Sequence, residues 1–120
     1  MSWNESKILT ARLTIYEAAR NMLAGKLSYI EGARRIVVAI AVSKLDEWDA
    51  DLVPFVAIDS ETEALPLGKM RAHWQAAALE ALEPEIAESE AWARQVGEPH
   101  CRNLVRRFSS GEIETRTLFG

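Results

Sequence analysis

The stretch AAALEALEPEIAESEAWARQV, residues 76–96, has the strongest helical composition in the chain. It is rich in Ala, Leu and Glu, which are among the best helix formers, and apolar residues continue at intervals as far as Phe108. Pro84 interrupts the pattern. Because proline fits the first turn of a helix, we expect a long helix to begin there after a short one. Gly97 and Pro99 are expected to bend the long helix or split it in two.

Two capping patterns nearer the start of the chain predict two more helices. Residues 2–5 and 28–31 both read S-x-x-E, in which the serine oxygen and the glutamate carboxylate satisfy free backbone N–H groups. The first helix is expected to stop at Gly25 and the second at about Lys44. The second contains IVVAIAV, residues 36–42, a β-branched run that could also form a buried strand. The capped start favours a buried helix.

A third, shorter helix is expected over residues 52–58, with Pro54 in its first turn and Asp49 or Asp51 as its cap. Turn-forming residues then predict a mostly irregular connection over residues 59–75. The sequence as a whole predicts an all-α fold, a compact bundle of four or five helices with an acidic irregular connection. Residues 1–108 are expected to form a single helical domain, and residues 109–120 a C-terminal tail that is loose or forms a short edge strand.

The charges of the chain are segregated along its length. Residues 1–44 carry seven basic and three acidic groups, a net charge of +4. Residues 45–90 carry two basic and twelve acidic groups, a net charge of −10, and residues 91–120 carry five basic and three acidic groups, a net charge of +2. Binding to a phosphate backbone needs clustered Lys and Arg, so we expect no nucleic-acid partner. The acidic block fits a basic protein partner, or pairing with the basic ends of the chain.

The start of the chain and its hydropathy indicate a soluble cytoplasmic protein without a membrane partner. MSWNESK lacks the basic and apolar regions of a signal peptide, and the longest apolar run falls far short of the roughly 20 residues of a membrane helix. Cys101 is the only cysteine, which excludes an intrachain disulfide.

The acidic block predicts the binding surface. Residues 45–68 carry seven carboxylates and no Lys or Arg, and Trp48 lies among them, where an exposed ring would anchor a partner. We give Trp48 equal weight as an interface or a core residue, and expect Trp74 and Trp92 to be in the core or half-buried. The leading hypothesis is a non-catalytic protein-binding domain that docks a basic partner through Asp46, Glu47, Trp48, Asp49, Asp51, Asp59, Glu61 and Glu63.

No catalytic, metal or cofactor site is expected. The carboxylates lack the EF-hand order, and His73, His100 and Cys101 are too few for a zinc site. Neighbours on a helix point about 100° apart, so His100 should be on the surface and Cys101 buried. Arg34 and Arg35 can complement the carboxylates, as can Arg102, Arg106 and Arg107, with Arg102 and Arg106 on one helix face.

Two other functions stay open. In the first, Asp59, Glu61, Arg71 and Trp74 line a pocket between helices, which would make the chain a small-molecule-binding or hydrolytic domain. In the second, the apolar segment 36–42 forms a homodimer, because a helix that is apolar all round needs burial on every side.

Several segments resemble a family of small, uncharacterised helical bacterial proteins. They include AGKLSYIEGAR at residues 24–34 and PFVAIDSETEALPLG at residues 54–68, followed by Arg71 and Trp74. The F-V-x-I-D-S-E-T segment is the most distinctive, and the likeness covers roughly residues 20–108. The resemblance implies a bacterial source and suggests an immunity protein that neutralises a secreted toxin.

Overall fold

Helix α2 (Tyr29–Ser43) begins where the second capping pattern predicts. In this computed structural model the Ser28 side chain accepts a hydrogen bond from the Glu31 N–H at 3.0 Å. The N–H groups of the first two helical residues, Tyr29 and Ile30, donate to the carboxylate of Glu90 at 2.6 and 3.2 Å. Glu90 belongs to α4 (Ala76–Ser109). The apolar run 36–42 is therefore helical, and the start of its helix is fixed by local and distant caps together.

The structure describes residues 3–66 and 68–115, and within them it forms helices without strands. Helix α1 (Trp3–Leu23) precedes α2, and α3 (Val53–Thr62) and the short 3₁₀ helix η1 (Gly68–His73) precede α4. The predicted all-α bundle is confirmed. The expected Ser2 cap and the last five residues of the tail lie outside the described residues.

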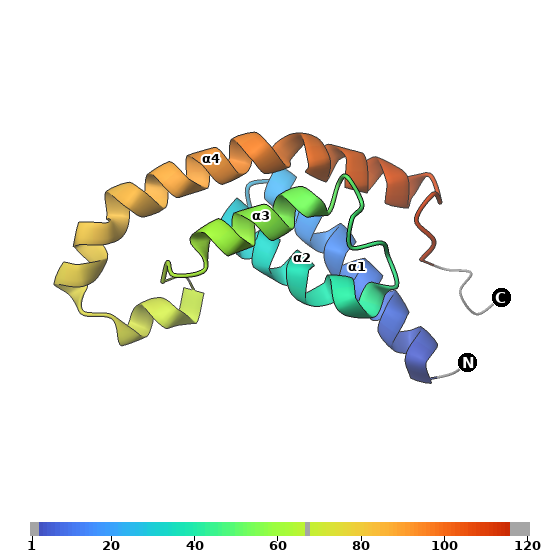
Figure 1. Cartoon of the computed structure of the whole chain (residues 1–120), viewed down its shortest axis with the longest axis horizontal. Coiled ribbons are helices and arrows are strands. Elements are labelled where there is room, and N and C mark those ends of the chain that lie inside the picture. The colour runs from blue at the N-terminus through green and yellow to red at the C-terminus, as the bar shows by residue number, and fades with distance from the viewer. Residues whose placement is uncertain (1–2, 67, 116–120) are drawn as a thin grey trace.

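Helix α4 is continuous over 34 residues, so the expected helix start at Pro84 and the expected split near Gly97 and Pro99 are wrong, whereas the alternative of a bend is not contradicted. Both prolines are exposed, and each removes one backbone hydrogen bond. Core contacts at an almost regular spacing of three or four residues hold the second half of the helix in place, and they offset that loss. These contacts come from Ala93, Gly97, Cys101, Leu104 and Phe108. Figure 1 shows α4 as one arch over the other helices.

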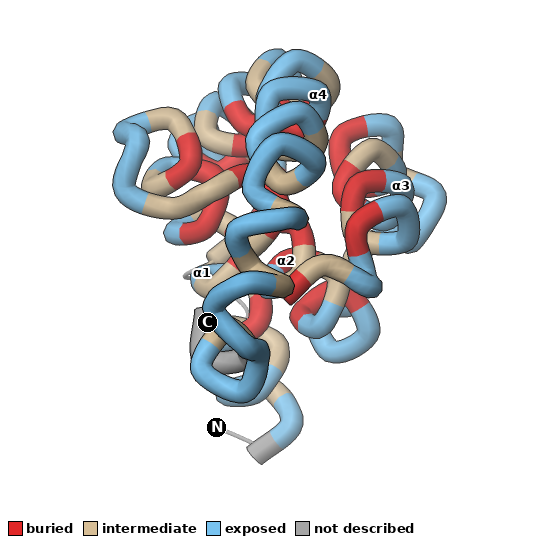
Figure 2. The backbone as a smooth tube through the Cα atoms, turned by 90° about the vertical axis from the view of Figure 1, so that its left-hand side faces the viewer, coloured by how far each residue is buried: buried red, intermediate tan, exposed pale blue. Residues whose placement is uncertain are grey.

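The remaining helices form a layer beneath this arch. Helices α1 and α2 lie side by side, joined through a turn in which Gly25 has a φ of +75°, as expected for a left-handed stop. Helix α4 packs on both of them, and α3 packs on α2 and α4 (Figure 1). Figure 2 shows the buried positions turned inward between the four helices. The molecule measures 54 × 28 × 24 Å. Its longest dimension is close to the length of α4, which is about 51 Å at 1.5 Å per residue.

At Gly97, α4 packs tightly against α2 and α3. A Cβ atom at this position would lie 3.1 Å from both the Phe55 ring and the Tyr29 ring, so a residue without a side chain lets the helices meet. The buried core around this point draws on all four helices. Its largest fully buried apolar side chains are those of Ile15, Met22, Ile30, Ile36, Leu52, Phe55, Ile58 and Leu104.

Two parts of the predicted connection differ from expectation. Helix α3 extends to Thr62, so residues 59–62 are helical rather than irregular. Its N-cap residue, Leu52, has no side-chain cap bond, so neither Asp49 nor Asp51 caps it. Both carboxylates are engaged by α4 instead, as the next subsection describes.

Residues 110–115 turn back onto the bundle. Ile113 is buried in the core and its N–H donates to the Arg107 carbonyl at 3.1 Å. Arg12 of α1 donates to the Glu114 carbonyl at 2.7 Å. The first part of the predicted tail therefore packs against the helical domain. Among the helices of residues 3–66 and 68–115, none combines the length and the apolar character needed to cross a membrane.

Candidate protein-binding surface

The connection between α2 and α3 presents Trp48 to solvent. The Trp48 N–H donates to the Asp46 carboxylate at 2.9 Å, and the Asp49 N–H donates to the Asp46 carbonyl at 3.0 Å. These two bonds close a tight turn with Trp48 at its tip. The Trp48 residue is 76% exposed, and its neighbours Asp46 and Glu47 are exposed as well. The structure thus places Trp48 on the surface rather than in the core.

Asp49 and Asp51 point the other way, toward α4. Arg107 donates to both oxygens of the Asp49 carboxylate, at 2.8 and 2.7 Å, and also to Asp51 at 2.8 Å. The other Asp51 oxygen accepts from the Asn103 amide at 3.0 Å and lies 2.9 Å from Nδ1 of His100. We refer to these five residues, Asp49, Asp51, His100, Asn103 and Arg107, as the Arg107 cluster. It fastens the loop that carries Trp48 to the last turns of α4.

The Arg107 cluster is polarised by its own hydrogen bonds. Those from Arg107 hold the pKa of Asp49 below its usual value, against an opposing effect of burial. For Asp51, burial alone would raise the pKa, but hydrogen bonds from His100, Asn103 and Arg107 outweigh it and the net shift is downward. The same carboxylates raise the pKa of Arg107. All three groups are therefore charged at neutral pH, and Asp49 and Asp51 serve the fold.

Asp59 also has a partner within the chain. Its carboxylate lies 3.6 Å from Nε of Arg34 on α2. The same Arg34 donates to the carbonyls of Thr62 and Leu65, just where α3 ends. Arg34 therefore caps the C-terminus of α3, and Asp59 helps to hold it there.

Glu61 joins a second acidic region that the sequence did not predict. It lines an open hollow of about 420 Å³ between α3 and α4, together with Glu85, Glu88 and Trp92. Trp92 is 38% exposed. The carboxylates that form this region come from opposite sides of the chain's longest connection, and no spacing rule in the sequence pairs them. Glu63 is exposed near the end of α3.

The predicted acidic surface is thus divided by the fold. Asp46 and Glu47 precede Trp48 near the start of α3, and Glu61 and Glu63 lie at the other end. Asp49, Asp51 and Asp59 form ion pairs within the chain between them.

The four residues of the alternative pocket have separate surroundings. Asp59 pairs with Arg34, and Arg71 pairs with Glu83 on α4. Glu61 lines the hollow described above, whose lining does not include the other three residues. Trp74 is more than one third exposed.

The remaining sequence candidates are structural. Arg102 pairs with Glu98 one turn away on α4, so it is Arg107 that reaches the acidic loop. Cys101 is fully buried, as expected, with its thiol 3.9 Å from the Met22 sulfur, and burial raises its pKa to about 12. A thiol with this pKa is not a nucleophile at neutral pH. His100 is partly exposed and bonds to Asp51, not to Cys101.

In the described part of the chain, no group of three or more His, Cys, Asp and Glu side chains is arranged to hold a metal ion. The chain was compared with protein-family models, curated proteins and solved structures, and it matches none of them.

Proposed function

We propose that this protein is a non-catalytic protein-binding domain that docks a basic partner through the Trp48 loop, residues 45–52. The observation that supports the proposal is the 76% exposure of Trp48 at the tip of an ordered turn, directly after two exposed acidic residues, Asp46 and Glu47. An aromatic ring in this position loses solvent when it enters a pocket on a partner, and such residues dominate binding energies. Carboxylates at its side favour a partner whose pocket is rimmed by Lys or Arg.

The loop is also prepared for binding. Two bonds to Asp46 close the turn, and the Arg107 cluster fixes the segment that follows it. A loop that is already ordered pays little conformational entropy on association. The acidic hollow around Glu61 and Trp92 would extend the same charge to a second contact area.

The resemblance noted above suggests a specific form of this proposal. In that form the chain is a cytoplasmic bacterial immunity protein, and the partner is a toxin whose basic active cleft the Trp48 loop covers. A gene for a secreted toxin next to the gene for this protein would provide the partner for the test.

The test begins with a photo-crosslinking amino acid at position 48, and at position 56 on the exposed side of α3 as the control. A basic protein should be crosslinked from position 48 and not from position 56. With that protein in hand, Trp48→Ala should weaken binding about 30-fold or more, as expected for a central aromatic anchor. Trp74→Ala is the matched control and should change affinity little.

Charge reversal then tests the electrostatic part. Asp46→Lys with Glu47→Lys should slow association about ten-fold at low ionic strength, and salt should diminish the difference. Glu80→Lys with Ala77→Lys and Ala81→Lys makes the same change in net charge at exposed positions of α4 that do not line the acidic hollow, and it serves as the control. If Trp48→Ala and the loop reversal both bind the partner like the wild type, the Trp48 loop is not the docking surface.

A further inference from the structure

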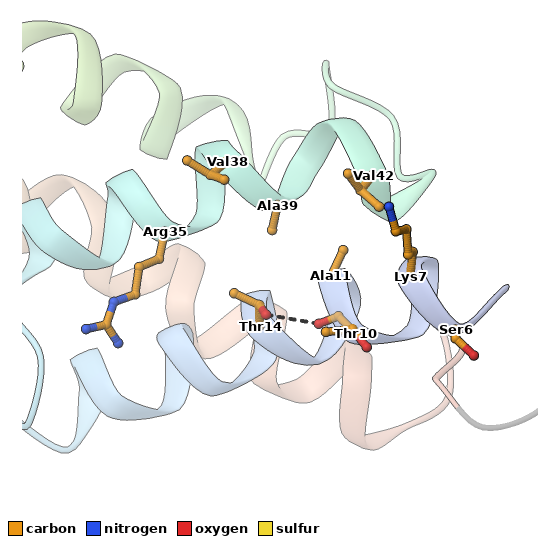
Figure 3. Close-up of a pocket in the computed structure, with 9 residues that line it drawn as sticks. All are labelled: Ser6, Lys7, Thr10, Ala11, Thr14, Arg35, Val38, Ala39 and Val42. Atoms are coloured by element: carbon orange, nitrogen blue, oxygen red, sulfur yellow. Dashed lines mark hydrogen bonds between the residues drawn. The ribbon is translucent and has the colours of Figure 1, made fainter. Parts of the chain in front are cut away.

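The outer face of the α1–α2 pair is apolar and open. A hollow of about 440 Å³ lies between the two helices, lined on α1 by Thr10, Ala11 and Thr14 and on α2 by Val38, Ala39 and Val42 (Figure 3). Val38 is 77% exposed, the largest exposure among the large apolar side chains that are described. Val42 is exposed in the same hollow, and Leu13 is exposed in an adjoining one. Valines and leucine in such a position are unfavourable in water.

One threonine of this face, Thr14, is less polar than the sequence suggests. The Thr14 hydroxyl donates to the Thr10 carbonyl within α1 at 2.9 Å (Figure 3). Its hydrogen-bonding need is then largely met inside the helix, so covering this residue would leave no unpaired donor. Thr14 can therefore be buried at little cost in lost hydration.

The charges of α1 lie at the two ends of the face. Lys7 lines the hollow at one end. Glu17 lies at the other end, in an adjoining hollow that it shares with Thr10, Leu13 and Thr14. Arg35 of α2 lines both hollows, and Lys44 lies next to Lys7. Lys7 and Glu17 are exposed.

These positions are symmetric about the level of residue 12. Residues 7 and 17 stand at equal distances on either side of it, as do residues 10 and 14. At 100° per residue, these four positions lie within about 40° of one line along α1. Arg12 itself points to the opposite side, where it bonds to the Ser43 and Glu114 carbonyls. A two-fold axis beside this line and perpendicular to α1 would bring Lys7 of one copy to the level of Glu17 of the other, and Thr10 to the level of Thr14.

We propose that this face is a homodimer interface in which α1 of one copy packs antiparallel on α1 of a second copy. An isologous contact requires each group and its complement on the same patch. The α1 face meets that requirement in charge, through Lys7 and Glu17, and in shape, through its small and apolar centre. The proposal is independent of the Trp48 loop.

Charge reversal on α1 tests both the interface and its direction. The wild type should dimerise between micromolar and millimolar concentration in sedimentation equilibrium at low salt. Lys7→Glu alone should set like charges against each other twice per dimer, as should Glu17→Lys alone. Each should weaken dimerisation about ten-fold or more. An equimolar mixture of the two variants should dimerise like the wild type, because each copy then supplies the charge that the other needs.

Two further variants separate this proposal from binding of a different partner. Val38→Asp should weaken the dimer, whereas Val56→Asp on α3, the matched control, should not. Arg35→Ala should leave self-association unchanged or strengthen it, because Arg35 would repel the approaching Lys7. Circular dichroism of each variant verifies the fold.

Three outcomes overturn the proposal. One is a wild type that stays monomeric at millimolar concentration. Another is a dimer that Lys7→Glu and Glu17→Lys do not weaken. The third is a mixture of the two variants that stays monomeric, which excludes the antiparallel register.

Discussion

At the scale of single residues, Arg107 determines which carboxylates of the Trp48 loop are bound within the chain. Its side chain is 17% exposed and holds Asp49 and Asp51 at the same time. The sequence indicated that Arg102, Arg106 and Arg107 could meet the acidic block, but it did not show which of them would do so. The rotation of α4 decides between them, and that rotation is set by which of its residues enter the core. Neither composition nor charge spacing contains this information.

Replacing Arg107 should therefore destabilise the protein far more than replacing Arg102. Arg107→Ala leaves two partly buried carboxylates facing each other, and we expect a loss of about 2–4 kcal/mol in the free energy of unfolding. Arg102→Ala removes an exposed pair one turn apart, for which about 0.5 kcal/mol or less is expected. Urea unfolding of both variants measures the difference. Equal losses would mean that the Arg107 cluster does not anchor the loop.

The same cluster predicts how stability depends on pH. The pKa values of Asp49 and Asp51 are lower in the folded protein than in the unfolded chain, where an aspartate titrates near ~3.9. The stabilisation is complete above that value and is lost as the pH falls through the folded-state pKa values. Asp49→Asn should be less stable than the wild type at neutral pH, and the gap should narrow below about pH 4. Urea unfolding from pH 7 to pH 3 tests this, and a gap independent of pH would contradict it.

At the scale of elements, the start of α2 combines a cap visible in the sequence with one that is not. Ser28 was expected, and its bond to the Glu31 N–H is present. The carboxylate of Glu90 reaches across the bundle and accepts from two further N–H groups, those of Tyr29 and Ile30. A negative charge at this end of the helix is also favoured by the helix dipole.

Glu90 should thus contribute more stability than its exposed neighbours on α4. Glu90→Ala leaves two N–H groups of α2 without their partner, and we expect a loss of about 1–3 kcal/mol. Ser28→Ala should cost about 1 kcal/mol by removing the local cap. Glu88→Ala, at an exposed position on the same helix, is the matched control and should change stability by less than about 0.5 kcal/mol. Thermal and urea unfolding decide, and a Glu90→Ala variant as stable as Glu88→Ala would refute the distant cap.

Helix existence was predictable at this scale, and helix ends were less so. The apolar periodicity of both segments and the cap at Ser28 predicted bounds for α1 and α2 close to those observed. Asp59, Ser60 and Thr62 favour turns by their own propensity, yet they are helical because Phe55 and Ile58 anchor α3 in the core. Pro99 does not end α4 for the same reason, since the buried stripe of α4 holds the chain on both sides of it. Pro84 lies in a part of α4 without buried residues, so core packing does not explain why the helix continues there. Where local propensity and core packing disagree, packing decided the outcome.

At the scale of the whole molecule, α4 consists of two halves with different support. The half from Ala93 to Phe108 contributes five buried residues to the core. Residues 76–92, all of which the structure describes, include no buried residue, and Leu79, Leu82 and Ile86 are only partly covered. The acidic hollow lies where the two halves meet. The sequence predicted one acidic surface on residues 45–68. In the structure, exposed carboxylates lie both on the Trp48 loop and around the hollow that Glu61 forms with the first half of α4.

This difference in support predicts two levels of protection against hydrogen exchange. A helix half without buried side chains opens locally at a small fraction of the free energy of global unfolding, whereas a half in the core opens only with the whole domain. Amides of residues 80–90 should therefore exchange at least about a hundred-fold faster than those of residues 97–108. Exchange followed by mass spectrometry or NMR at neutral pH measures this ratio. Arg71→Ala removes the pair with Glu83 and should speed exchange in the first half alone. Uniform protection along α4 would contradict this prediction, because it would mean that both halves of the helix open with the same free energy.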